Sequence, residues 1–126
     1  MKYIQPKQLA IPKGHYSPAI VHNQLVYVSG QLPIKEDGMI ELGSVEQQTE
    51  LCMKNIQVIL ETAGSSLSHT LKFTVYTSNI ELWDRINAIY AQYLGNHKPA
   101  RVVVPCTTLH YGCLIEIECV AAVKTS

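Results

Sequence analysis

The segment from residue 114 to residue 123, Leu-Ile-Glu-Ile-Glu-Cys-Val-Ala-Ala-Val, constrains the fold more than any other stretch of the chain. Side chains of a β-strand point to opposite faces in turn, so a period of two separates two sets of residues. The apolar set comprises Ile115, Ile117, Cys119, Ala121 and Val123. The other set comprises Leu114, Glu116, Glu118 and Val120. The segment therefore predicts a strand in a sheet that buries one face and leaves a mixed face for solvent, a cleft or a subunit contact.

A second β-rich run precedes it, beginning at Arg101 and continuing through three valines to Pro105. If the two runs pair, Arg101 would lie near Glu116 or Glu118. An arginine beside a carboxylate would suit a small anionic substrate, because the planar guanidinium binds carboxylates through two parallel hydrogen bonds. Each of these residues, taken alone, is more often a solvated surface group.

Length and composition narrow the class of protein. The chain has 126 residues, 47% of them hydrophobic, which predicts one ordered domain over residues 1–126. No apolar run is long enough to span a bilayer, and the N-terminus lacks the apolar core of a signal peptide, so we expect a cytoplasmic protein without a membrane partner. Ten basic residues balance ten acidic ones, and a nucleic-acid partner is therefore not expected.

The four cysteines form no C-x-x-C pair, and neither a metal nor a cofactor is expected. Two less favoured hypotheses remain for the loop after the arginine run. Cys106, His110 and Cys113 would make an incomplete metal site, because a fourth ligand is missing. Cys106 would alternatively act as a nucleophile with His110 as its base. Small buried thiols are the more common outcome for such residues.

The first half of the chain predicts an arm, a hairpin and a helix. Residues 1–14 contain two prolines and a glycine and are expected to be an extended arm. Residues 16–21 and 25–29 are β-rich and flank a turn at 22–24, which is typical of a hairpin. Ser44 and Gln47 have the spacing of a capping box, and apolar residues at helical spacing follow, so a helix is expected over 45–63.

The second half predicts a strand over residues 71–77 and a second helix that ends at Gly95. Two residues compete to cap this helix at its N-terminus, Ser78 with Glu81 as a capping box, or Asn79. The expected order is β-β-α-β-α-β-β, an α+β fold in which two helices cover one face of a mixed sheet. The other face would remain partly open and apolar, which predicts an oligomer.

Several short segments resemble the Rid family, the reactive intermediate deaminases, also called the YjgF-like or L-PSP family. The most specific is Pro99-Ala100-Arg101, followed by Val104, Leu109 and Ile115-Glu116-Ile117. Further similar segments are Tyr16-Ser17 after Gly14, Ser29-Gly30-Gln31, Ala63-Gly64, and Asn87 with Ala88 and Tyr90. The resemblance covers nearly the whole chain.

The resemblance implies a chorismate-mutase-like fold and a homotrimer whose sheets form a central barrel, with clefts between the subunits. It implies hydrolysis of enamines and imines such as 2-aminoacrylate and 2-iminopropanoate, giving 2-oxo acids and ammonia without a cofactor. Arg101 would hold the substrate carboxylate, and Glu116 would handle protons around the attacking water. The remaining substrate-binding residues implied by the resemblance are Tyr16, Ser29, Gly30, Asn87 and, through its backbone, Val103.

The chain departs from the family pattern at His15, Pro18 and Val103 and in the loop from Pro105 to His110. These departures affect the substrate preference more than the basic chemistry. Two other functions stay open at this point. One is a non-catalytic trimer that binds a small carboxylate for regulation. The other is an endoribonuclease or translation inhibitor of the L-PSP type, which the neutral net charge disfavours.

Overall fold

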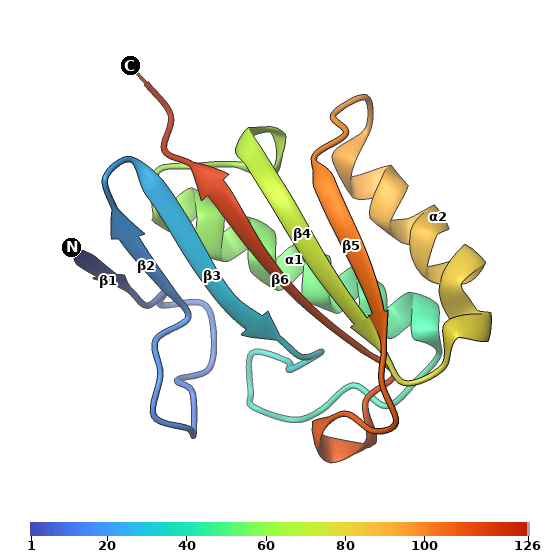
Figure 1. Cartoon of the computed structure of the whole chain (residues 1–126). Helices are drawn as coiled ribbons and strands as arrows, with labels where there is room; N and C mark the ends of the chain where they lie inside the picture. Colours follow the sequence, from blue (N-terminus) through green and yellow to red (C-terminus); the bar gives the residue numbers. More distant parts are fainter. Residues whose placement is uncertain (126) are drawn as a thin grey trace.

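A computed structural model describes residues 1–125 of the chain as a six-stranded sheet with two long helices (Figure 1). The strands are β1 (Lys2–Ile4), β2 (Ala19–His22), β3 (Leu25–Gln31), β4 (Thr70–Thr77), β5 (Ala100–Pro105) and β6 (Ile115–Ala122). Their order across the sheet is β1-β2-β3-β6-β4-β5. The β4–β5 pair is parallel and the other pairs are antiparallel. The sheet is therefore mixed, as the sequence predicts.

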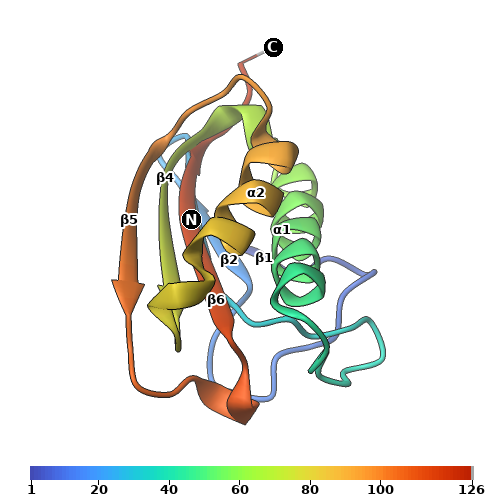
Figure 2. The same cartoon turned by 90° about the vertical axis from the view of Figure 1, so that its right-hand side faces the viewer.

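The helices α1 (Val45–Thr62) and α2 (Trp83–Leu94) lie side by side on one face of the sheet. Figure 2 shows that the opposite face carries no helix. This two-layer arrangement confirms the predicted α+β fold with two helices behind a mixed sheet. Over residues 1–125, no helix combines the length and the apolar character that crossing a membrane requires.

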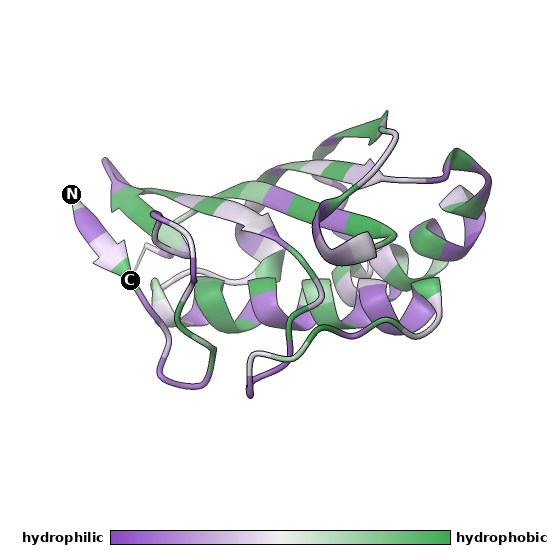
Figure 3. Ribbon diagram, turned by 90° about the horizontal axis from the view of Figure 1, so that it is seen from below, coloured by the Kyte–Doolittle hydropathy of each residue, from purple (hydrophilic) through white to green (hydrophobic). Residues whose placement is uncertain are grey.

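Strand β6 occupies the middle of the sheet and divides its residues between the two faces. Burial alternates along the strand, with Ile115, Ile117, Cys119 and Ala121 buried against the helices. The hydropathy colouring in Figure 3 shows the same alternation along the strands above the helix layer. Burying these side chains contributes about 25 cal/mol per Å² of apolar surface, so the face assignment of this strand is strongly fixed.

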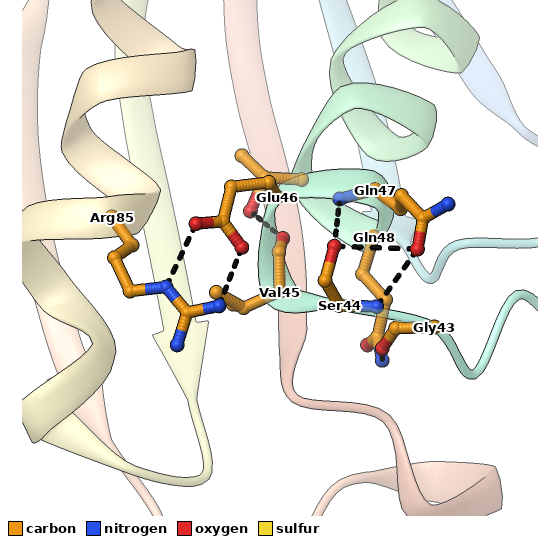
Figure 4. Close-up of polar contacts among 8 residues, drawn as sticks. Gly43, Ser44, Val45, Glu46, Gln47, Gln48 and Arg85 are labelled. Carbon is orange, nitrogen blue, oxygen red and sulfur yellow. Dashed lines mark hydrogen bonds and ion pairs between the residues drawn. The ribbon is translucent and has the colours of Figure 1, made fainter.

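The predicted capping box opens α1. The backbone N–H of Gln47 donates to Ser44 Oγ at 3.2 Å, and the Ser44 N–H donates to Gln47 Oε1 at 2.9 Å. In the same first turn, Glu46 accepts two hydrogen bonds from Arg85 of α2, as Figure 4 shows. The helix thus starts where the sequence predicts, and it ends one residue earlier, at Thr62.

The second helix begins differently from the capping-box hypothesis. A short 3₁₀ turn, Ile80–Leu82, precedes α2, and Asn79 Oδ1 accepts the N–H of Glu81 at 3.0 Å. Of the two candidates, Asn79 is therefore the one that caps, but it caps this 3₁₀ turn, whereas α2 itself follows Leu82 without a side-chain cap. Gly95 follows α2 with a φ of 60°, in agreement with the predicted end.

Three further expectations need correction. The arm contains strand β1, because Lys2–Ile4 pairs with β2. The period of two along residues 71–77 places Leu71 on the same face as Phe73, Val75 and Thr77, but the register of β4 shifts between Thr70 and Lys72, and Leu71 is exposed. Finally, β5 does not pair with β6, since β4 lies between them.

Candidate functional site

Arg101 lies on β5 at the edge of the sheet and points toward the helix layer. In the β4–β5 ladder it is opposite Phe73, a buried core residue, and partners in a ladder share a face. Its Nη1 donates to Asn87 Oδ1 at 2.9 Å. Its Cζ lies 4.6 Å from the ring centroid of Trp83 and 5.1 Å from that of Tyr90.

The three contacts of Arg101 come from one face of α2. Trp83, Asn87 and Tyr90 are spaced by four and three residues, so they form one stripe along the helix. Cation–π attraction to the two rings orients the plane of the guanidinium, and the amide of Asn87 fixes one of its edges. Arginine carries five N–H donors, and the hydrogen bond to Asn87 uses one of them. Arg101 is therefore held in place and keeps donors free for an anion.

A second group of predicted site residues lies where β3 ends and β6 begins. A Cβ built on Gly30 would collide with the carboxylate of Glu116, so the carboxylate packs directly over this glycine. The adjacent Ser29 Oγ donates to the backbone oxygen of Ser17 at 2.7 Å and ties the segment that carries Tyr16 to β3. Tyr16, Gly30 and Glu116 thus form one compact group.

The electrostatics of this group favour a proton-accepting role for Glu116. Burial, and then the charge of Glu118, raises the pKa of Glu116, while nearby His110 opposes the shift. Burial, with smaller effects of Glu116 and Tyr111, raises the pKa of Tyr16, so its phenol stays protonated. A carboxyl group with a raised pKa is a better base toward water than an ordinary surface carboxylate.

The two groups do not meet within one chain. Glu116 is opposite Tyr76 in the β4–β6 ladder, on the face that no helix covers, whereas Arg101 points to the helix face. The expectation that pairing of the two β runs would bring Arg101 beside an acid is therefore wrong. Strand β4 separates them, and the face assignments place them on opposite sides of the sheet. Val103, two residues beyond Arg101, shares the face of Arg101 and its backbone lies on the edge strand.

The loop hypotheses based on cysteine receive no geometric support. Cys106 Sγ donates to the Thr77 backbone oxygen at 3.4 Å, and the ring of His110 contacts that of Tyr111 in a tilted arrangement, with centroids 3.9 Å apart. Within residues 1–125, no three His, Cys, Asp or Glu side chains are grouped as metal ligands would be. Both residues of the proposed nucleophile pair thus have other contacts.

Sequence reasoning missed the aromatic contacts of Arg101. Trp83 and Tyr90 appear in the sequence as part of an apolar helix face, and their additional role follows only from the placement of β5 beside α2. The signal was present as the spacing of an aromatic residue, an amide and a second aromatic residue on one stripe. His110 lowers the pKa of Glu116 and Tyr111 raises that of Tyr16, and no spacing in the sequence indicated either effect.

We expect Gly30→Ala to lower activity far more than it lowers stability. The added methyl group would occupy the space of the Glu116 carboxylate and displace it. A steady-state assay should show a loss of more than tenfold in kcat/KM, since small displacements of a reacting group have large effects. Gly95→Ala provides a control, because its added Cβ would meet no atom within 4 Å, although its φ of 60° adds backbone strain. Full activity in a folded Gly30→Ala protein would contradict the placement of Glu116.

Comparison with known proteins agrees with the fold. The family model described as endoribonuclease L-PSP matches residues 7–123. A RutC family protein of Pyrococcus abyssi is 41% identical over 111 residues, 87% of each chain. AldR of Lactococcus lactis, described as a proposed regulator, is 40% identical over 126 residues, 99% of this chain and 100% of its own. The Escherichia coli TdcF structure with bound serine has a TM-score of 0.92 at 27% identity and covers 98% of this chain and 100% of its own. The chain belongs to the YjgF/RutC/Rid family, whose family model carries the description endoribonuclease L-PSP.

Proposed function

We propose that the protein hydrolyses reactive 2-imino acids, formed directly or from enamines such as 2-aminoacrylate, to 2-oxo acids and ammonia. Membership of the family supports a role in small-molecule processing or regulation. The observation that carries the finer proposal is the guanidinium of Arg101, which is oriented by Trp83, Asn87 and Tyr90 and keeps donors free. Such a group is preorganised for the carboxylate that every 2-imino acid carries.

The remaining chemistry needs one water and one proton carrier. The water oxygen forms a bond to C2 of the N-protonated imine while Glu116 accepts one water proton and the C=N π pair moves to nitrogen, giving a neutral carbinolamine. Glu116 then delivers that proton to nitrogen, the C–N bond breaks with its electron pair leaving on ammonia, and the hydroxyl proton passes back to Glu116 as the C–O bond becomes the carbonyl of the 2-oxo acid. General acid–base help of this kind is worth roughly 10²–10⁴-fold.

A complete site requires a second copy of the chain. We infer that Arg101, Asn87 and the backbone of Val103 from one subunit face Tyr16, Ser29, Gly30 and Glu116 from its neighbour. The open face of the sheet supports this inference, because it presents apolar side chains such as Tyr27, 46% exposed, and Val102, 42% exposed. Three such contacts close into a trimer with three equivalent clefts.

Light scattering is expected to give a mass about three times the 14.0 kDa of one chain. Val102→Glu places a charge on the open face and should shift the mass toward the monomer with loss of activity, since a buried unpaired charge is costly. Leu42→Glu, at an exposed apolar residue in the loop before α1, is the matched control and should remain trimeric. A folded monomer with wild-type turnover would contradict the shared site.

The activity itself is tested with freshly generated imino acid. An amino acid oxidase supplies the imine, and ammonia release is followed with a reaction lacking the protein as the control for spontaneous hydrolysis. We expect the protein to accelerate ammonia release. The regulatory alternative, which corresponds to the description of AldR as a regulator, predicts binding of 2-oxo acids without this acceleration.

Cleavage of RNA is disfavoured by charge. The chain has ten basic and ten acidic residues, and phosphate contacts need a positive surface. Specific RNA cleavage at ordinary salt that disappears in Glu116→Gln would favour the ribonuclease function over the deaminase.

A further inference from the structure

Three buried side chains that form hydrogen bonds lie on one stripe of α1. They are Gln48, Cys52 and Asn55, which are spaced by four and three residues and therefore point the same way from the helix. Each of them forms a hydrogen bond with the backbone of a segment outside the helix. Because a buried polar group is costly unless it is hydrogen-bonded, these contacts fix the segments to α1.

The stripe holds the two strand ends between which the Glu116 carboxylate lies. The N–H of Leu114, just before β6, donates to Gln48 Oε1 at 2.8 Å. Cys52 Sγ donates at 3.3 Å to the backbone oxygen of Gln31, the last residue of β3. The residue before Gln31 is the glycine over which the Glu116 carboxylate packs. Helix α1 therefore fixes β3 and β6 at the point where this contact is made.

The start of β6 depends on Gln48 because β3 does not reach it. The β3–β6 ladder ends at the pair of Gln31 with Ile117, and in the described part of the chain the residues of β6 before Ile117 pair with β4 alone. The backbone oxygen of Leu114 accepts a hydrogen bond from Thr77 Oγ1 of β4 at 3.0 Å. Its N–H is the group that Gln48 binds, so Gln48 supplies support that β3 does not give.

The amide of Gln48 is itself held at both ends. Its Nε2 donates to the backbone oxygen of Gly43 at 3.0 Å, in the loop before α1 where Figure 4 shows the two residues together. The amide oxygen is thereby directed toward Leu114. An amide can accept from one N–H and donate to one carbonyl at the same time, which an apolar side chain cannot do. Its removal would leave both backbone groups without these partners.

We propose that Gln48 is a positioning residue of the reaction, which holds the backbone of Leu114 and thereby sets the place of the Glu116 carboxylate. This inference rests on the proposed function, because it takes Glu116 as the group that accepts the proton of water. The stripe of α1 then does for Glu116 what the stripe of α2 does for Arg101. A shift of about 1 Å in a reacting group can lower the rate by about 10²-fold, so a residue behind the sheet can control turnover.

Gln48→Met gives the direct test, because it keeps the length of the side chain and removes both hydrogen bonds. We expect single-turnover ammonia release to slow by about tenfold or more, while the Kd for pyruvate stays within about threefold of wild type. Gln57→Met is the matched control, the same change on the same helix, at a side chain whose hydrogen bond goes to Glu61 one turn further on. It should leave both values unchanged.

A double-mutant cycle separates positioning from general destabilisation. In Glu116→Gln the group that Gln48 positions is already lost, so adding Gln48→Met should slow ammonia release by less than about twofold more. An effect of Gln48→Met on the whole structure would instead be added in full. Additive losses in folded proteins would therefore overturn the positioning role.

The outcomes also distinguish this inference from the proposed function. Turnover that falls in Glu116→Gln but stays at the wild-type level in folded Gln48→Met would overturn the positioning role and leave the deaminase proposal standing. Absence of turnover in the wild-type protein would overturn both. If Gln48→Met does not fold, Gln48→Asn keeps an amide on a shorter side chain that cannot reach both partners. The same cycle then applies, and wild-type turnover in folded Gln48→Asn would overturn the positioning role.

Discussion

Arg101→Ala is expected to weaken binding of 2-oxo acids by roughly one to three decades. A charge-assisted hydrogen bond contributes about 1.5–3 kcal/mol and a lost partner of a desolvated charge pair costs about 2–5 kcal/mol, at about 1.4 kcal/mol per decade. Arg101→Lys should recover only part of this loss, because an ammonium cannot reproduce the two parallel donors or the stacking on Trp83 and Tyr90. Isothermal titration with pyruvate and 4-methyl-2-oxopentanoate measures the effect.

Arg85→Ala is the matched control for this experiment. Arg85 is also an exposed arginine of the α2 region, but its guanidinium is engaged by Glu46 of α1 (Figure 4). Its removal should leave ligand affinity within about twofold of wild type, since surface ion pairs contribute little even to stability. Unchanged affinity in a folded, trimeric Arg101→Ala protein would remove Arg101 as the carboxylate anchor.

Local patterns predicted most elements because local interactions decide them. The Ser44 and Gln47 box positions the start of α1 through hydrogen bonds within four residues. The turn after β2 places Asn23 and Gln24 at φ values of 51° and 67°, the left-handed geometry that tight hairpins need. Strand β1 was not predicted, because it has only three residues, too few to show an alternation of polar and apolar side chains. These residues form a strand by pairing with β2.

The candidate site was predictable as a set of residues but not as an arrangement. The alternation of side chains along a strand predicts that Arg101 and Val103 share a face of the sheet. It does not predict which face of the sheet the helices cover. That depends on the strand order, in which the parallel β4–β5 pair places β5 at the edge beside α2. The separation of Arg101 from Glu116 is therefore a property of topology, and it is the reason why the proposed site draws residues from two chains.

Glu116→Gln is expected to lower turnover by roughly 10²–10⁴-fold while leaving binding of 2-oxo acids nearly intact. Glutamine keeps the shape that packs over Gly30 but cannot accept the proton of the attacking water. Single-turnover ammonia release measures the chemical step, and titration with pyruvate measures binding in the same preparations. A parallel loss of binding and turnover would instead make Glu116 a residue that shapes the pocket.

The pH dependence supplies a second readout, with Glu118→Gln as its companion. Glu116 must be ionised to accept a proton, so activity should fall as the pH decreases through the pKa of this group, which burial and the charge of Glu118 raise. Glu118, which accepts a hydrogen bond from the Tyr76 hydroxyl at 2.6 Å, contributes to raising that pKa through its charge. Removing this charge should move the acidic limb of kcat/KM to lower pH with little change in the plateau. An acidic limb that stays in place in Glu118→Gln would mean that a group other than Glu116 controls the proton transfer.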